Sequence, residues 1–106
     1  MTILYVVNIK GLPDEARIVD EATVGSKKLI IAVRVLKPGE VVEPHKHEVE
    51  EQFYLVLSGK GIVKIGEEER EVGPLDAVYI PPKTLHSSKA VGDEPFRYLY
   101  VEALGQ

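Results

Sequence analysis

Short apolar runs, several of them alternating with polar residues, recur along most of the chain, and glycine or proline interrupts them about every eight to twelve residues. Segments of this length bounded by turn-forming residues are typical of β-strands. We find no amphipathic helical pattern, so the sequence predicts an all-β domain, either a sandwich or a barrel. Strands are expected at Thr2–Ile9, Arg17–Asp20, Lys28–Leu36, Glu51–Leu57, Ile62–Ile65, Glu69–Val72, Ala77–Ile80, Leu85–Ala90 and Phe96–Glu102.

Glycine and proline define the turns between these strands. In Lys37-Pro38-Gly39-Glu40 the proline and the glycine occupy the two central positions of a type II turn, because glycine adopts the required positive φ at low cost. Gly66 and the acidic residues after it join two strands in a predicted hairpin. No linker or repeat divides the sequence, so we expect residues 1–106 to form one domain.

Composition and charge narrow the classes of function. The chain has 106 residues, with 13 lysines and arginines against 17 aspartates and glutamates and a net charge of −4. Binders of nucleic acids or anionic membranes normally carry a basic excess, so neither partner is expected. No apolar run approaches the roughly 18–20 residues that span a bilayer, and the first residues lack signal-peptide features, which predicts a cytoplasmic protein. The absence of cysteine excludes thiolate chemistry and disulfides.

The three histidines are the most informative polar residues. His45 and His47 are separated by one residue, and His86 lies in a later predicted strand. Residues two apart on a strand face the same side, about 6.6–6.8 Å apart, so two imidazoles there can converge on one metal ion while Lys46 points the other way. The alternative is a pair of solvent-exposed histidines on a polar strand edge, and the spacing alone favours that alternative.

The residues around this pair resemble the first sequence motif of the cupin superfamily, G-x5-H-x-H-x3–4-E-x6-G. Gly39, His45, His47, Gln52 and Gly59 follow its spacing, with glutamine in the place of glutamate. The resemblance implies a cupin jelly-roll-like β-barrel with the histidines inside.

A later segment resembles the second cupin motif, G-x5-P-x-G-x2-H-x3-N. It keeps the proline and the histidine as Pro81 and His86, whereas Leu75 and Lys83 replace the two glycines and Ala90 replaces the asparagine. None of the replaced residues is a metal ligand, so the differences concern turn geometry more than the site. Lys83 in particular has to accept or avoid a positive φ.

Two neighbouring residues compete for the fourth ligand position. Glu51 satisfies the x3 spacing after His47 but leaves seven residues before Gly59, whereas Gln52 satisfies the spacing on both sides. Successive strand residues face opposite ways, so only one of the two points into the barrel. We favour Gln52; the alternative is that Gln52 only hydrogen-bonds to nearby backbone or to a ligating histidine.

The resemblance implies one divalent transition-metal ion bound by His45, His47, Gln52 and His86. A glutamine oxygen is neutral and a poorer donor than a carboxylate, so these ligands leave the metal charge uncompensated, which weakens affinity and favours anionic substrates or hydroxide. Imidazole suits zinc, nickel, copper and iron, and a mixed nitrogen and oxygen site also admits manganese. The ligands do not choose among these metals.

Cupins include dioxygenases, isomerases, epimerases, decarboxylases, lyases and non-enzymatic binding proteins, so the resemblance implies the activity only in broad terms. We expect a metal-dependent enzyme acting on a small, anionic organic molecule, with dioxygenase chemistry slightly ahead of isomerase or lyase chemistry. The alternative is a non-catalytic protein that binds or senses a small molecule in the same barrel. A transcriptional role is not expected, because neither a DNA-binding helical pair nor a basic patch is visible.

The strand that contains Gln52 is apolar on both sides. Tyr54 shares the Gln52 side, where it either lines the pocket or packs in the core. Phe53, Leu55 and Leu57 occupy the opposite side and also need cover, which predicts a partner subunit and therefore a homodimer.

Acidic residues occur in two further groups. Glu48 and Glu50 are expected on a solvated acidic edge, with support of the metal site as the alternative role. Residues Glu67–Glu71 are expected to be solubilising surface at the tip of a hairpin.

Overall fold

The computed structural model describes residues 4–105, and most of them lie in short antiparallel strands. The two helical turns among them are too short and too polar to cross a bilayer. In chain order the elements are η1 (Ile9–Gly11), β1 (Ala16–Val19), α1 (Glu21–Val24), β2 (Leu29–Leu36), β3 (Val41–His45), β4 (Glu51–Ser58), β5 (Lys60–Ile65), β6 (Glu68–Val72), β7 (Ala77–Ile80), β8 (His86–Val91) and β9 (Phe96–Ala103).

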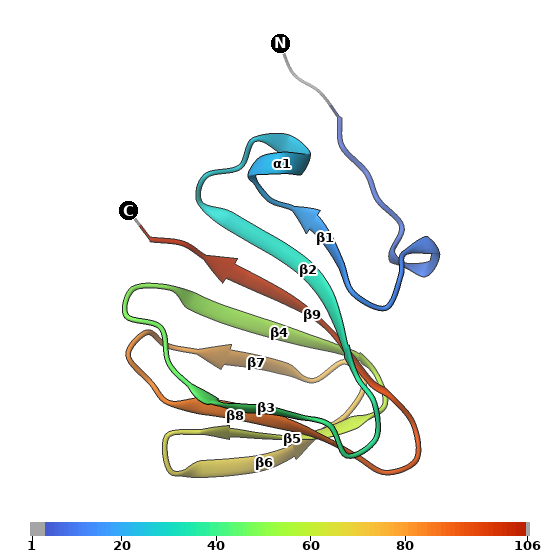
Figure 1. Ribbon diagram of the computed structural model, residues 1–106, viewed down its shortest axis with the longest axis vertical. Coiled ribbons are helices and arrows are strands. Elements are labelled where there is room, and N and C mark those ends of the chain that lie inside the picture. Colours follow the sequence, from blue (N-terminus) through green and yellow to red (C-terminus); the bar gives the residue numbers. More distant parts are fainter. Residues whose placement is uncertain (1–3, 106) are drawn as a thin grey trace.

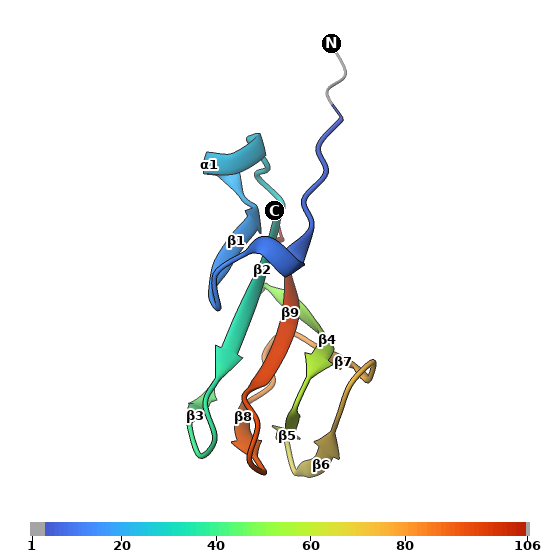
Figure 2. The same cartoon turned by 90° about the vertical axis from the view of Figure 1, so that its right-hand side faces the viewer.

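The strands form two antiparallel sheets that face each other (Figure 1). The larger sheet has the order β1-β2-β9-β4-β7 and the smaller has the order β3-β8-β5-β6. From β2 to β5 and again from β6 to β9, each connection carries the chain from one sheet to the other. Figures 1 and 2 place α1 and β1 at one end of the long axis and the smaller sheet at the other. The predicted all-β jelly-roll fold is confirmed.

An aromatic cluster forms the centre of the core between the sheets. Phe96 and Tyr98 are fully buried, with ring centroids 5.1 Å apart, and the Tyr54 ring lies 4.7 Å from that of Tyr98. A Cβ atom on Gly61 of β5 would lie only 2.4 Å from the Phe96 ring. The close approach of the Phe96 ring to the β5 backbone therefore requires glycine at that position.

The side of the larger sheet that faces away from the smaller one is also apolar. Phe53 and Tyr79 on this side are 37% and 56% exposed, which confirms that β4 carries apolar residues on both faces. Cross-strand neighbours form two rows, Ile31, Val101, Phe53 and Tyr79 in one and Val33, Leu99, Leu55 and Ala77 in the other. We call these two rows the outer face.

The predicted first strand, Thr2–Ile9, is wrong over the residues that the structure describes. Residues 4–8 pair with no strand in the described part of the chain, and Thr2 and Ile3 lie outside it. The Asn8 side chain accepts a hydrogen bond from the Lys10 N–H at 2.9 Å, which stabilises η1. An apolar run does not become a strand without a neighbour to satisfy its backbone groups.

Besides η1, two further elements lie where none was expected. One is α1, a single turn in which the Asp20 side chain accepts from the Thr23 N–H and the Thr23 hydroxyl accepts from the Asp20 N–H, both at 2.8 Å. Gly25 ends this turn with a φ of 74°. This capping box followed by glycine is a helix signal in the sequence. The other is β3. The sequence led us to expect an extended backbone around His45, but not a strand with these bounds.

Two predictions about turns are settled by backbone geometry. In the turn at residues 37–40, the Glu40 N–H donates to the Lys37 carbonyl at 2.8 Å and Gly39 has a φ of 86°, which confirms the expected turn. In the second cupin-like segment, Leu75 and Lys83 adopt φ values of 70° and 62°. Both residues therefore adopt the left-handed conformation that glycine accepts at low cost, although it costs a residue with a side chain about 1–2 kcal/mol.

Candidate metal centre

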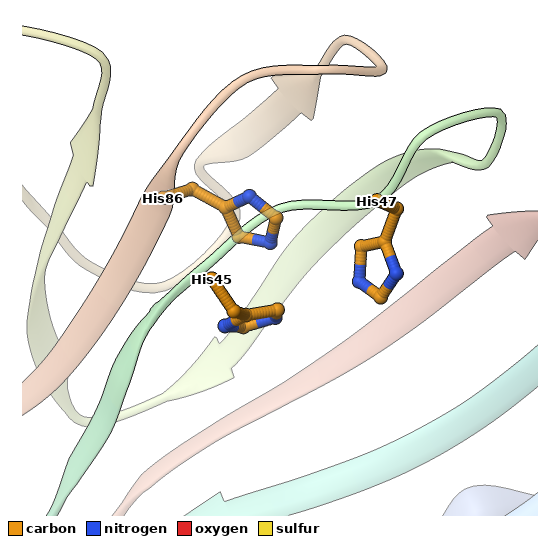
Figure 3. Close-up of side chains that lie close together, drawn as sticks. All are labelled: His45, His47 and His86. Carbon is orange, nitrogen blue, oxygen red and sulfur yellow. The ribbon is translucent and has the colours of Figure 1, made fainter.

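Three histidines from two parts of the chain meet between the sheets (Figure 3). His45 ends β3 and His86 begins β8, and the two are directly opposite in the register of these antiparallel strands. His47 lies two residues beyond the end of β3. One ligand nitrogen from each ring lies within 4.8 Å of the others, close enough for all three to hold one metal ion.

Backbone carbonyls orient two of the three rings. The Nδ1 of His45 lies 2.8 Å from the Glu43 carbonyl oxygen, and the Nδ1 of His86 lies 2.9 Å from the Thr84 carbonyl oxygen. A carbonyl only accepts hydrogen bonds, so Nδ1 carries the hydrogen in both rings and Nε2 keeps its lone pair. Such a contact fixes the tautomer that presents Nε2 to a metal ion.

His47 is positioned by the turn before β8. Its carbonyl oxygen accepts a hydrogen bond at 2.7 Å from the N–H of Lys83, the residue with the left-handed backbone. The His47 side chain points inward while Lys46 is exposed, as the sequence predicts. His47 Nδ1 lies 3.4 Å from a carboxylate oxygen of Glu50. His47 Nε2 is thus left to face the other two rings.

Three buried ligand atoms have no hydrogen-bond partner among the described residues: His47 Nε2, His86 Nε2 and Gln52 Oε1. A buried polar atom without a partner destabilises a protein by about 1–3 kcal/mol, so a cluster of such atoms calls for an occupant. Imidazole nitrogens and an amide oxygen are ligands that divalent transition metals accept. The residues present therefore fit a metal ion.

Gln52 points into the protein, and Glu51 points out. Gln52 is 8% exposed, whereas Glu51 lies on the surface and accepts a hydrogen bond from the Tyr79 hydroxyl at 2.6 Å. The prediction that Gln52 is the inward residue is confirmed. Its amide Nε2 donates to Glu102 Oε1 at 3.2 Å, so the amide oxygen is free.

A cavity of about 120 Å³ opens beside the histidines, on the side of β2, β9 and β4 that faces the smaller sheet. Tyr54 belongs both to this wall and to the core cluster, so its two predicted roles coincide. Arg34, Tyr98, Tyr100 and Glu102 were not expected at the site, because the register of β2, β9 and β4, and not a local pattern, places them on the Tyr54 side. The wall consists of Arg34, His45, His47, Gln52, Tyr54, Tyr98, Tyr100 and Glu102.

Burial is the main electrostatic influence on the site. It lowers the pKa of the His86 imidazole, an effect that the Thr84 carbonyl opposes and the neighbouring histidines reinforce. The lowered pKa favours the neutral imidazole, which is the form that binds metals. Burial also raises the pKa values of the Tyr54 and Tyr98 hydroxyls, so both phenols keep their protons.

The two acidic residues between His47 and β4 have different surroundings. Glu48 is exposed, as expected for a solvated edge. Glu50 is only partly exposed and lies beside His47, where the alternative role in support of a metal site would require it. Ligand atoms of His47, Glu50 and Glu102 also lie within 4.8 Å of one another, which brings two carboxylates close to the histidine cluster.

Three curated proteins are similar to this chain. MJ1618 of Methanocaldococcus jannaschii is 35% identical over 72 residues, which are 68% of this chain and 58% of that protein. The dimethylsulfoniopropionate lyase DddW of Ruegeria pomeroyi is 35% identical over 74 residues, 70% of this chain and 47% of the lyase. The oxalate-binding protein of Thermotoga maritima is 26% identical over 92 residues, 87% of this chain and 76% of that protein. The chain thus spans about half the length of the first two relatives.

A solved structure supports the fold. The crystal structure of BH2720 from Bacillus halodurans has a TM-score of 0.83 and 24% identity, and it covers 96% of this chain and 82% of that one. The family model described as a cupin domain matches residues 32–102, which include all three histidines and Gln52. Because this match covers more than half of the sequence, the chain belongs to the cupin family.

Proposed function

We propose that this protein binds one divalent transition-metal ion through His45, His47, His86 and Gln52, and that the loaded site is an enzyme for a small organic carboxylate. The convergence of imidazole nitrogens whose opposite ring atoms are already held supports the metal site most directly. Because these two rings are already oriented, fewer side chains have to become ordered when a metal ion binds.

The charges in the pocket favour an anionic substrate. Three neutral imidazoles and one amide would leave the positive charge of a divalent ion uncompensated by its ligands. Arg34 adds a second positive group to the same wall, with its guanidinium carbon 5.4 Å from the centre of the Tyr100 ring. Among the residues that the structure describes, Glu102 is the one carboxylate of this wall, so a divalent ion together with Arg34 would still leave the pocket net positive for a small carboxylate. Two of the similar proteins are named for carboxylates, namely dimethylsulfoniopropionate and oxalate.

The hydroxyl groups of the pocket suit proton transfer to a substrate, which a lyase or an isomerase would use. A bound divalent ion would act as a Lewis acid towards a substrate oxygen. The Tyr98 hydroxyl is buried beside Arg34 and Ser88, and its raised pKa keeps it protonated. It is therefore available to donate a hydrogen bond or a proton to a bound substrate. Dioxygenase chemistry, expected first from the resemblance, stays a prediction.

Metal analysis of the untagged protein, purified without chelators, tests the binding site. We expect about one transition-metal ion per chain, and we expect the double variant His45→Ala/His47→Ala to lose it while keeping its β-sheet circular dichroism. Lys46→Ala is the matched control, because Lys46 lies between the two histidines and is exposed. Full metal content in the double variant would show that the assignment is wrong.

Incubation of the metal-loaded protein with a panel of small carboxylates tests the reaction class. We expect product by NMR without oxygen consumption, and loss of product when a chelator removes the metal. Oxygen uptake in proportion to product would instead identify a dioxygenase. Metal-dependent binding of a carboxylate by calorimetry with no conversion of any panel member would identify a binding protein and overturn the enzymatic proposal.

A further inference from the structure

We infer that Glu102 is a positioning residue for the metal site, which turns the Gln52 amide oxygen towards the histidines and supplies a negative charge that the ligands lack. The inference rests on the proposed metal binding. In the cupin motif a single glutamate at position 52 would supply both a ligand atom and a negative charge. Here Gln52 would supply the ligand atom and Glu102, on the neighbouring strand, the charge.

The register of the larger sheet places the two side chains together. Gln52 of β4 and Glu102 of β9 are direct cross-strand partners, although 50 positions separate them in the sequence. Strand alternation turns both side chains towards the cavity, and both belong to its wall. Their contact is the Nε2–H···Oε1 hydrogen bond of 3.2 Å.

This hydrogen bond selects one of two amide orientations. A glutamine side chain can rotate to present either its oxygen or its NH2 group to a neighbour, and the two orientations have nearly the same shape. A carboxylate accepts hydrogen bonds only, so Glu102 binds the NH2 group and leaves Oε1 free. Oε1 is buried and has no hydrogen-bond partner among the described residues. Without Glu102, nothing in this contact would disfavour the orientation that presents N–H groups to a cation.

The location of Glu102 also suits charge compensation. One of its carboxylate oxygens lies within 4.8 Å of a His47 ring nitrogen, so its negative charge lies near the cluster although the amide, not the carboxylate, occupies the ligand position. Charges separated by a few ångströms in a partly buried site interact strongly. Glu102 is therefore expected to raise the affinity for a cation even without touching it.

Reversal of the pair provides the test. Zn²⁺ is the probe, its affinity is measured by competition with a chromophoric chelator at constant pH, and the thermal midpoint without metal reports folding. We expect Glu102→Gln to weaken Zn²⁺ binding by about 10–100-fold, as is typical when a group that orients a ligand is removed. We expect Gln52→Glu/Glu102→Gln to restore the wild-type affinity or exceed it, because the new glutamate ligates directly and the new glutamine can donate to it.

The matched control is Glu51→Gln, which removes the adjacent carboxylate on the outside of the same strand. It should leave the Zn²⁺ affinity unchanged. Wild-type protein that binds Zn²⁺ no better than the His45→Ala/His47→Ala variant would overturn the proposed function. The positioning role alone would be overturned if Glu102→Gln binds Zn²⁺ as tightly as the wild type, or if the reversed pair does not restore the affinity that Glu102→Gln loses. If Glu102→Gln does not fold, Glu102→Ala replaces it in the same comparison, and a wild-type Zn²⁺ affinity in that variant would refute the inference.

Discussion

Replacement of Gly61 by alanine probes the contact on which the core depends. The new Cβ atom would lie 2.4–2.7 Å from three atoms of the Phe96 ring, whereas carbon atoms in contact normally keep about 3.5–4.0 Å. The ring has little room to retreat, because Phe96 is fully buried and packs on Tyr98. The backbone of Gly61 is also confined, because β5 pairs on one side with Val72 of β6 and on the other with β8.

The overlap of about 1 Å has to be relieved by displacing the ring or β5. Overpacking of a well-packed core destabilises a protein by about 1–3 kcal/mol. For a domain of this size, each kcal/mol lowers the midpoint of thermal unfolding by about 4–8 °C. We therefore expect Gly61→Ala to unfold roughly 5–20 °C below the wild type.

Thermal and urea unfolding, followed by circular dichroism, measure this loss. Gly11→Ala is the control, since no atom lies within 4 Å of a Cβ at Gly11 and its φ is not positive. The double variant Gly61→Ala/Phe96→Leu separates the contact from a general effect on β5, because leucine lacks the ring atoms that the new methyl group meets. We expect the free energy of unfolding of the double variant to be about 1 kcal/mol higher than the sum of the two single effects predicts. Strict additivity would refute the explanation.

Alkaline stability tests the buried phenols. Burial raises the pKa of Tyr54 above its ordinary value near 10, so its stabilising contribution is complete below about pH 10 and is lost as the pH rises towards the folded-state pKa. Urea titrations should show less loss of stability above pH 10 in Tyr54→Phe, and an unchanged pH profile would contradict this. Zn²⁺ at 100 times its dissociation constant should stabilise the wild type by about 2.7 kcal/mol but not His45→Ala/His47→Ala, and an equal rise in the thermal midpoint of both would argue against the site. On the outer face we expect a second copy of this chain, because an apolar patch can pair with itself about a two-fold axis. Light scattering should then detect a dimer, and Phe53→Lys should convert it to a monomer. A monomeric wild type would refute this expectation.

The sequence by itself determined most of the local structure. Alternation and β-branched runs located eight of the nine predicted strands to within a residue or two, because these patterns depend on neighbours close in the chain. The positive φ at Gly39 followed from the residue type in the same way. Resemblance to the cupin motifs identified the three histidines, and strand alternation together with motif spacing chose Gln52 over Glu51 as the inward residue. The failure over residues 4–9 shows the limit of an apolar run as evidence, since a strand also needs a partner.

Only the tertiary structure decided which polar groups surround the histidines. Arg34, Tyr98 and Glu102 have ordinary strand sequences around them, and no local pattern connects them with Gln52. Their convergence follows from the pairing of β9 between β2 and β4, which joins residues about 50–70 positions apart. Alternation tells which residues share a side of one strand, but the register between distant strands sets which side chains meet. For that reason the three histidines and the inward side of Gln52 could be predicted from the chain, whereas the carboxylate beside Gln52 emerged only once the sheet was assembled.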